Sequence, residues 1–237
     1  AADASPWPKL LTLLIAALLA GLLPTPAKAD KVAVVQRSTD DGLNQSQVRS
    51  ILQDDEGFLW LGTHVGGVDR FDGLTFIHHT VRQGLPSNLV IDIAEVDGLI
   101  LLGTRLGLAL ESSHGRFDAL PLPEGFADPQ VNALAADGQG GVWVATYSGL
   151  FHWTKGGLKP AEGISPQTIW AVSKDSAGTL WVSAEEGLFS GAPGGPLKRH
   201  PQSEALGRVR KIQADALGGV WLATRSELYM SQEGDIS

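Results

Sequence analysis

Apolar and polar positions alternate along this chain in short runs, and the runs recur at a fixed spacing. In the clearest copy, residues 54–63, a polar turn leads into an apolar strand with the order Asp-Asp-Glu-Gly-Phe-Leu-Trp-Leu-Gly-Thr. The string returns at 137–146 and 215–224, and at 175–184 with Ala in the last place. This recurrence predicts one structural unit repeated along the chain.

Each unit is expected to contain four short strands. In the first complete unit the strands are predicted at 48–53, 58–63, 68–71 and 75–80, because apolar and β-branched residues cluster there. Asp and Gly in the intervening segments are typical of tight turns. A further strand is expected at 31–37, and if the units close into a ring it could complete the last unit, whose own fourth strand is not evident.

The spacing of the units predicts the fold class. Trp60 or its equivalent recurs at residues 101, 143, 181 and 221, which is about every 40 residues. Four strands in about 40 residues are typical of a propeller blade. We therefore expect an all-β fold, a β-propeller with about five four-stranded blades. The second unit, built on Leu101, is degenerate.

The recurring residues are expected to be structural. An aromatic side chain at a fixed phase fills the gap between packed sheets, so the predicted core residues are Trp60, Trp143, Trp181 and Trp221. The Asp of each string is interpreted as a turn residue rather than a catalytic one, and the Thr as structural.

Residues 1–29 are expected to be a secretory signal peptide. Lys9 precedes a largely apolar run of residues 10–23, which is short for a membrane span, and the small-x-small triplet 27–29 follows. Cleavage is expected before Asp30, which leaves residues 30–237 as the propeller domain. The alternatives are an uncleaved membrane anchor and a buried helix.

Composition narrows the range of partners. The net charge is −8 and the basic residues do not cluster, which argues against nucleic acid or anionic lipid as partners. The chain has no Cys, so disulfides and thiolate chemistry are excluded.

The strings at 48–73 and 209–228, with the loops at 40–43 and 83–86, resemble the two-component regulator propeller repeat. In that family such propellers form the periplasmic ligand-sensing part of membrane receptors. The resemblance implies a non-catalytic sensor anchored in the inner membrane, followed by a β-sandwich, a membrane span and a histidine kinase or diguanylate cyclase output domain. It is compatible with a homodimer. Because the family usually builds seven blades or more, we expect the five units to be part of a truncated seven-bladed ring.

The residue after each Thr or Ala is the candidate ligand contact. It changes from unit to unit while the scaffold before it stays the same: His64, Arg105, Tyr147, Glu185 and Arg225. A rim of unlike polar groups suits a small polar ligand or an oligosaccharide. At the same rim, with less support, we expect Gln47, Asn88, Gln130, Gln167 and Arg208.

Other chemistry is scarce in the sequence. His78 and His79 are adjacent on a predicted strand and therefore point to opposite faces, so no shared metal is expected. Adjacent carboxylates such as Asp54 and Asp55 do not by themselves make a glycosidase pair. No cofactor is predicted. Two alternatives stay open: a secreted propeller enzyme, such as a lyase or a quinoprotein, and an interaction scaffold in the cell envelope.

Overall fold

The computed structural model describes residues 34–113, 115–123, 126, 128–215, 217–232 and 235–236. The chain divides into two compact units, residues 1–36 and 37–237, and the second unit contains every described strand. The predicted signal peptide at 1–29 lies outside the described residues. No helix in the described ranges is long and apolar enough to cross a membrane.

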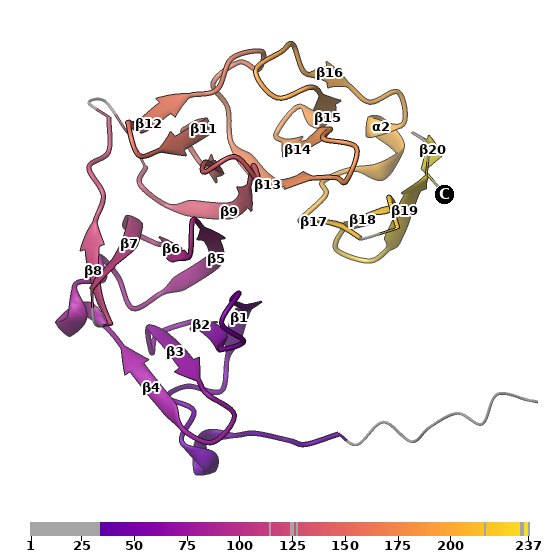
Figure 1. Ribbon diagram of the computed structural model, residues 1–237. Helices are drawn as coiled ribbons and strands as arrows, with labels where there is room; N and C mark the ends of the chain where they lie inside the picture. The colour runs from indigo at the N-terminus through magenta and orange to yellow at the C-terminus, as the bar shows by residue number, and fades with distance from the viewer. Residues whose placement is uncertain are drawn as a thin grey trace, which may run out of the picture. The chain divides into compact units, whose positions relative to one another are not determined.

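Residues 37–237 form five four-stranded antiparallel sheets, which confirms the predicted β-propeller of about five blades (Figure 1). Blade 1 contains β1 (Val48–Gln53), β2 (Leu59–Thr63), β3 (Val68–Phe71) and β4 (Phe76–His79). Blade 2 contains β5 (Val90–Val96), β6 (Leu99–Thr104), β7 (Gly107–Ser113) and β8 (Arg116–Ala119). Blade 3 contains β9 (Val131–Ala136), β10 (Val142–Thr146), β11 (Gly149–Thr154) and β12 (Gly157–Pro160).

Blade 4 contains β13 (Ile169–Lys174), β14 (Leu180–Ala184), β15 (Gly187–Gly191) and β16 (Lys198–Arg199). Blade 5 contains β17 (Lys211–Ala214), β18 (Val220–Ala223), β19 (Leu228–Gln232) and β20 (Asp235–Ile236). Within the described ranges, three short helices lie between strands or before them: η1 (Thr39–Asp41), η2 (Val81–Gln83) and α2 (Ser203–Leu206).

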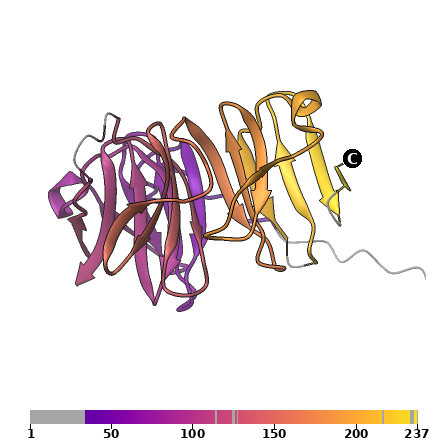
Figure 2. The same cartoon turned by 90° about the horizontal axis from the view of Figure 1, so that it is seen from above.

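The first strand of each blade lies at the inner edge of its sheet. Strand order within every sheet follows chain order, and β1, β5, β9, β13 and β17 contact one another in succession around a common axis (Figure 1). Because the strands alternate in direction, the loops before the first strand and after the second strand emerge at one end, here called the upper rim. The turns after the first and third strands emerge at the other end, the lower end. Figure 2 shows the blades packed face to face.

The prediction of an N-terminal strand at 31–37 is wrong over residues 34–37, which have no strand structure. Residues 31–33 lie outside the described ranges. The fourth strand of blade 5 is instead β20, which pairs with β19 through Ser231 and Ile236. β20 was not predicted because two residues are too few to give an alternating pattern.

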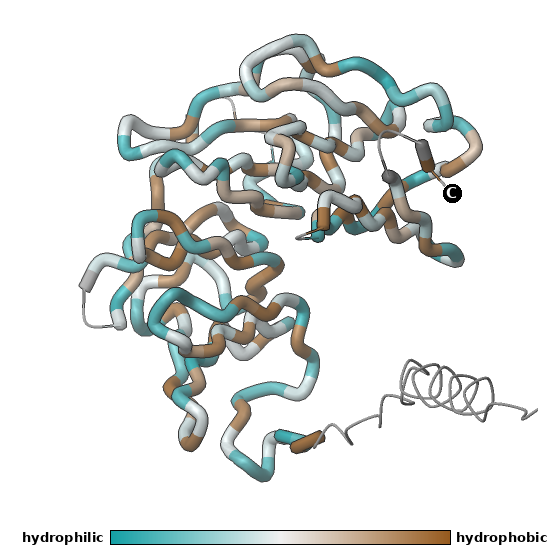
Figure 3. The backbone as a smooth tube through the Cα atoms, turned by 45° about the vertical axis from the view of Figure 1, so that its right-hand side comes forward, coloured by the Kyte–Doolittle hydropathy of each residue, from teal (hydrophilic) through white to brown (hydrophobic). Residues whose placement is uncertain are grey.

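The core lies between blades rather than within them. Each blade presents its large side chains to the next blade: Trp60 packs with Val90 and Ile100 of blade 2, and Trp181 packs with Ile212 and Leu222 of blade 5. In the degenerate second unit, Leu101 takes the place of Trp and is fully buried. Hydrophobic positions, brown in Figure 3, recur along the blades, and β10 and β14 are buried at every position because both faces of their blades are covered. The structural role predicted for these side chains follows from this packing.

Each recurring Asp joins the turn to the Trp. Asp54 accepts a hydrogen bond from the amide of Phe58 at 2.8 Å and from the indole N–H of Trp60 at 2.7 Å. The same two bonds recur at Asp175 and Asp215. These contacts explain why Asp stands six residues before Trp. In blade 3 the second oxygen of Asp137 contacts His152 instead.

Blades 1 and 5 each have one uncovered face. Trp221 is 38% exposed, whereas Trp60, Trp143 and Trp181 are at most 5% exposed. On blade 1, Ile51 is 66% exposed. Among the described residues, the core clusters join consecutive blades and none joins blade 5 to blade 1.

Candidate functional site

The recurring Thr builds the loops of the upper rim. Thr146 donates its hydroxyl hydrogen to the carbonyl oxygen of Gly149 at 2.8 Å and accepts the amide hydrogen of Ser148 at 3.1 Å. Thr63, Thr104 and Thr224 make the equivalent pair of bonds. The hydroxyl therefore fixes the backbone of a tight turn, and the residue after Thr is held at a defined place on the rim.

Four of the five predicted ligand contacts lie on these turns and Glu185 lies on the equivalent turn after Ala184, but the five do not form one cluster. Arg105, Glu185 and Arg225 are exposed, and Tyr147 is 36% exposed. His64, Arg105 and Tyr147 contact residues at the start of an inner strand or just before it, rather than one another. His64 Nδ1 lies 3.3 Å from Arg49 Nη1, and Arg105 Nη1 contacts Gln130 Oε1.

The most developed part of the rim is an aromatic and cationic group that we call the Trp170 cluster: Tyr147, Trp170 and Arg208. The edge of one ring meets the face of the other between Tyr147 and Trp170, with ring centroids 5.5 Å apart and planes at 81°. The guanidinium carbon of Arg208 lies 4.2 Å from the Trp170 ring centroid, a cation–π contact. The indole nitrogen of Trp170 is buried without a hydrogen-bond partner. The cluster therefore joins blades 3 and 4 to the loop before blade 5.

The less supported rim residues divide into two kinds. Gln130 donates to Asn132 at 3.0 Å and, with its contact to Arg105, extends the polar surface from blade 2 to blade 3. Arg208 belongs to the Trp170 cluster. Asn88 has a structural role, because its side-chain oxygen accepts the amide of Val81, and Gln167 pairs with Glu186 across one turn. Gln47 is exposed.

Below the rim, the inner strands line a cavity of about 460 Å³, here called the axial cleft. Its charged lining residues are Arg49, Asp92, Lys174 and Lys211, which come from four different blades. Lys211 Nζ lies 3.4 Å from Asp92, so this ion pair joins blade 5 to blade 2. Asp92 is nearly buried and also accepts the amide of Leu134 at 2.9 Å.

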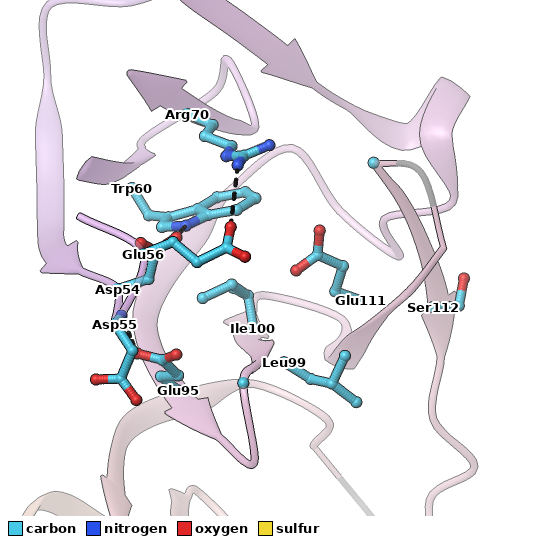
Figure 4. A pocket seen from close by; sticks show the side chains of 12 residues that line it. Asp54, Asp55, Glu56, Trp60, Arg70, Glu95, Leu99, Ile100, Glu111 and Ser112 are labelled. Carbon is cyan, nitrogen blue, oxygen red and sulfur yellow. Dashed lines mark hydrogen bonds and ion pairs between the residues drawn. The ribbon is translucent and has the colours of Figure 1, made fainter. Parts of the chain in front are cut away.

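A second cavity, of about 430 Å³, opens at the lower end between blades 1 and 2 (Figure 4). Trp60 and Ile100 form its apolar wall. Its charged lining residues are one cation and five carboxylates: Arg70, Asp54, Asp55, Glu56, Glu95 and Glu111. The Arg70 guanidinium lies 3.6 Å from Glu56 and stacks on Phe58 at 3.6 Å.

Two of these carboxyl groups are harder to ionise than usual. Burial raises the pKa of Glu111, and the charges of Asp54 and Glu56 add to the effect. Burial also raises the pKa of Glu95, again with help from the neighbouring acids, although the amide of Asp55 opposes it. The Asp54 carboxylate already accepts hydrogen bonds from the Phe58 amide and from the Trp60 indole. The adjacent pair Asp54 and Asp55 therefore serves the turn and the blade contact.

His78 and His79 point to opposite faces of β4, as predicted. His78 Nδ1 lies 2.8 Å from Asp69, whereas His79 stacks on Trp60 with ring centroids 5.7 Å apart and contacts the carbonyl of Gly115. Burial lowers the pKa of His79. Within the described ranges there is no group of three His, Cys, Asp or Glu side chains that could hold a metal ion.

Sequence reasoning missed Trp170 and the axial cleft. Trp170 occupies the second position of the inner-strand segment, where the other units have Arg49, Ile91, Asn132 and Arg210. An aromatic residue at a position where the other units have none could have marked Trp170 as a candidate in the sequence. No such mark exists for the Lys211–Asp92 ion pair, because the two residues are 119 positions apart.

The comparisons with known proteins support the resemblance drawn from the repeat. The family model of the two-component regulator propeller matches residues 42–64 and 125–148. No curated protein matches the sequence.

Solved structures give the wider likeness. The extracellular domain of BT4673 from B. thetaiotaomicron, described as a hybrid two-component system, is 28% identical with a TM-score of 0.68. The alignment covers 79% of this chain and 27% of that one. The extracellular domain of BT3049 from the same organism is 23% identical with a TM-score of 0.69, over 86% of this chain and 31% of that one. This chain thus spans about a third of those domains or less.

A third likeness shows the fold alone. Virginiamycin B lyase from Staphylococcus aureus is 14% identical with a TM-score of 0.68, over 83% of this chain and 70% of that one. At this identity the likeness reports a shared propeller architecture and carries no argument about chemistry.

Proposed function

We propose that residues 37–237 are the ligand-sensing propeller of an exported, membrane-anchored signal-transduction receptor, and that the upper rim binds a small polar ligand or an oligosaccharide. The likeness to extracellular domains of hybrid two-component systems supports the signalling role and the export. The periplasmic location, the following β-sandwich and the kinase or cyclase output are parts of the same proposal.

One observation carries the binding role. The Thr-capped turns repeat, yet the side chains that they present differ. Tyr147, one of these side chains, packs against Trp170, which is absent from the core clusters of the described residues and also contacts Arg208 of the loop before blade 5. Tyr147 and Trp170 offer aromatic surface, Tyr147 adds a hydroxyl group, and Arg105 and Arg208 offer charged donors. This combination suits a polar ligand with a ring.

A thermal-shift screen with neutral and acidic oligosaccharides tests the proposal. We expect at least one compound to raise the melting temperature of the chain, because a ligand that binds only the folded state stabilises it. Tyr147→Ala and Trp170→Ala should each remove that shift. Tyr229→Ala, at the other tyrosine of the chain and on β19, is the matched control and should keep it. If no compound raises the melting temperature of the chain, or if a compound raises that of the two rim variants as much as that of the wild type, the proposed function is wrong.

A further inference from the structure

The axial cleft is built from strand edges that have no neighbour. Each inner strand pairs with the second strand of its own blade only, so its other edge faces the axis. Such an edge presents free amide and carbonyl groups. Side chains from the adjacent blade satisfy some of them: Asp92 accepts the amide of Leu134, and Ser173 accepts the amide of Ala214 at 3.3 Å. The lining is therefore polar and rich in hydrogen-bonding groups.

The charge of the cleft is opposite to that of the chain. Arg49, Lys174 and Lys211 are cationic, and Asp92 is the one acidic side chain among the lining residues. The chain as a whole has a net charge of −8. A cleft with low-dielectric walls and one sign of charge concentrates the field inside it and attracts ligands of the opposite sign.

The single carboxylate does not neutralise the three cations. Asp92 is shared between the Leu134 amide and Lys211 Nζ, and Lys174 Nζ donates to the backbone carbonyl of Asp137. The Lys211 side chain remains 55% exposed, and Arg49 is exposed, with its Nη1 3.3 Å from Nδ1 of the His64 ring. Arg49 and Lys211 thus keep donors available to a molecule in the cleft.

We propose that the axial cleft binds the anionic group of a sugar-sized ligand, with Lys211 and Arg49 as its charged contacts. This inference rests on the proposed ligand-sensing function and specifies the ligand as an acid. Arg49 lines the cleft and also contacts His64 of the upper rim, so one ligand can reach both places. A volume of about 460 Å³ lies within the usual range for small-molecule sites.

Calorimetric titration with a matched pair of probes tests the proposal. D-Glucuronate and D-glucose have the same ring and differ by one carboxylate, and inorganic sulfate supplies an anion without a ring. We expect glucuronate to bind at least about tenfold more tightly than glucose or sulfate, since a charged hydrogen bond in the site supplies that difference. Affinity for glucuronate should fall as salt is added.

Variants locate the site. Lys211→Gln and Arg49→Gln should each weaken glucuronate binding about tenfold or more, whereas Lys198→Gln, an exposed cation on the outer strand β16, should not. Arg49→Gln guards against a folding effect, because it leaves the Lys211–Asp92 pair in place.

The outcomes separate the two claims. Equal binding of glucose and glucuronate overturns the acidic-ligand inference and leaves the proposed sensing function standing. Binding of sulfate as tight as that of glucuronate, or unchanged binding in both cleft variants, also overturns the inference. If neither sugar binds while another compound in the thermal-shift screen does, the inference fails alone; if nothing binds in either experiment, both fail.

Discussion

Thr63, Thr104, Thr146 and Thr224 close the same kind of turn, and the side chain that follows each of them is free to differ. Where the hydroxyl is missing, at Ala184, the turn is held in another way: the amide of Leu188 donates to Ser203 Oγ at 2.8 Å. At the scale of single residues, therefore, constant groups hold the backbone and variable groups face outward. Burial decides how much each constant group contributes to stability.

Replacing Thr146 by Val should lower the free energy of unfolding by about 1–3 kcal/mol, because a half-buried amide and a buried carbonyl lose their partner. Thr224 makes the same bonds in an exposed turn, where water replaces them. Thr224→Val is therefore the matched control and should cost less. Urea unfolding of both variants checks this, and an equal loss would contradict the role assigned to burial.

His79 should make the fold sensitive to mild acid. Burial lowers its pKa below the ordinary value of 6.5, so the folded chain holds the neutral ring. Its contribution to stability is complete above pH 6.5 and is lost as the pH falls through the lowered pKa. His79→Gln should thus lose less stability than the wild type between about pH 7.5 and about pH 5.

Urea unfolding at the two pH values measures that difference. The raised pKa values of Glu95 and Glu111 act in the opposite direction, because protonation of these groups relieves the folded state, and they are common to both proteins. His78→Gln, at the half-exposed neighbour, is the control. The same pH dependence in His79→Gln and wild type would show that His79 does not titrate as described.

At the scale of elements, the turns determine where each strand begins. The boundaries predicted for blade 1 agree with the structure to within one residue at β1 to β4, because Asp and Gly mark the turns in the sequence. Asp72, for example, accepts the amides of Leu74 and Thr75 at 2.8 and 2.7 Å. The short β16 and β20 could not be predicted in the same way, since two residues carry no periodic signal.

Gly67 should tolerate no side chain, whereas Gly73 should tolerate one at moderate cost. Both have positive φ, 85° and 98°. A Cβ at Gly67 would lie 2.1 Å from the carbonyl oxygen of His79, while a Cβ at Gly73 would meet nothing within 4 Å. Gly73→Ala should cost about 1–2 kcal/mol from backbone strain. Gly67→Ala should cost more by about 2 kcal/mol or above, because backbone must also move. Thermal unfolding checks the order; equal melting temperatures would contradict it.

At the scale of the whole molecule, the period of the repeat was enough to predict the architecture, because each blade covers the next with large apolar side chains at the same positions of the repeat. The ligand site was harder to predict than the fold. The five rim residues were chosen because their type differs from one unit of the repeat to the next, and their contact with a ligand stays a prediction. Trp170 and the Lys211–Asp92 pair depend on how blades are placed around the axis, which no local pattern records.

The uncovered face of blade 5 gives a prediction about stability. Trp181→Ala should lower the free energy of unfolding by about 3–5 kcal/mol, as expected for a buried Trp. Trp221→Ala should cost clearly less, since 38% of that residue is already exposed and less apolar area is lost. Urea unfolding of the two variants makes the comparison. A loss at Trp221 as large as at Trp181 would mean that its face is covered in solution.

Hydrogen–deuterium exchange, measured with and without a compound that raises the melting temperature, shows where that compound binds on the chain. If the upper rim is the ligand site, exchange slows at the rim and the inner strands, in residues 47–50, 104–106, 146–148, 168–172 and 208–212. Exchange in the lower turns 54–58 and 97–100 should not change. Protection confined to those lower turns, or no protection anywhere, would contradict a ligand-sensing rim.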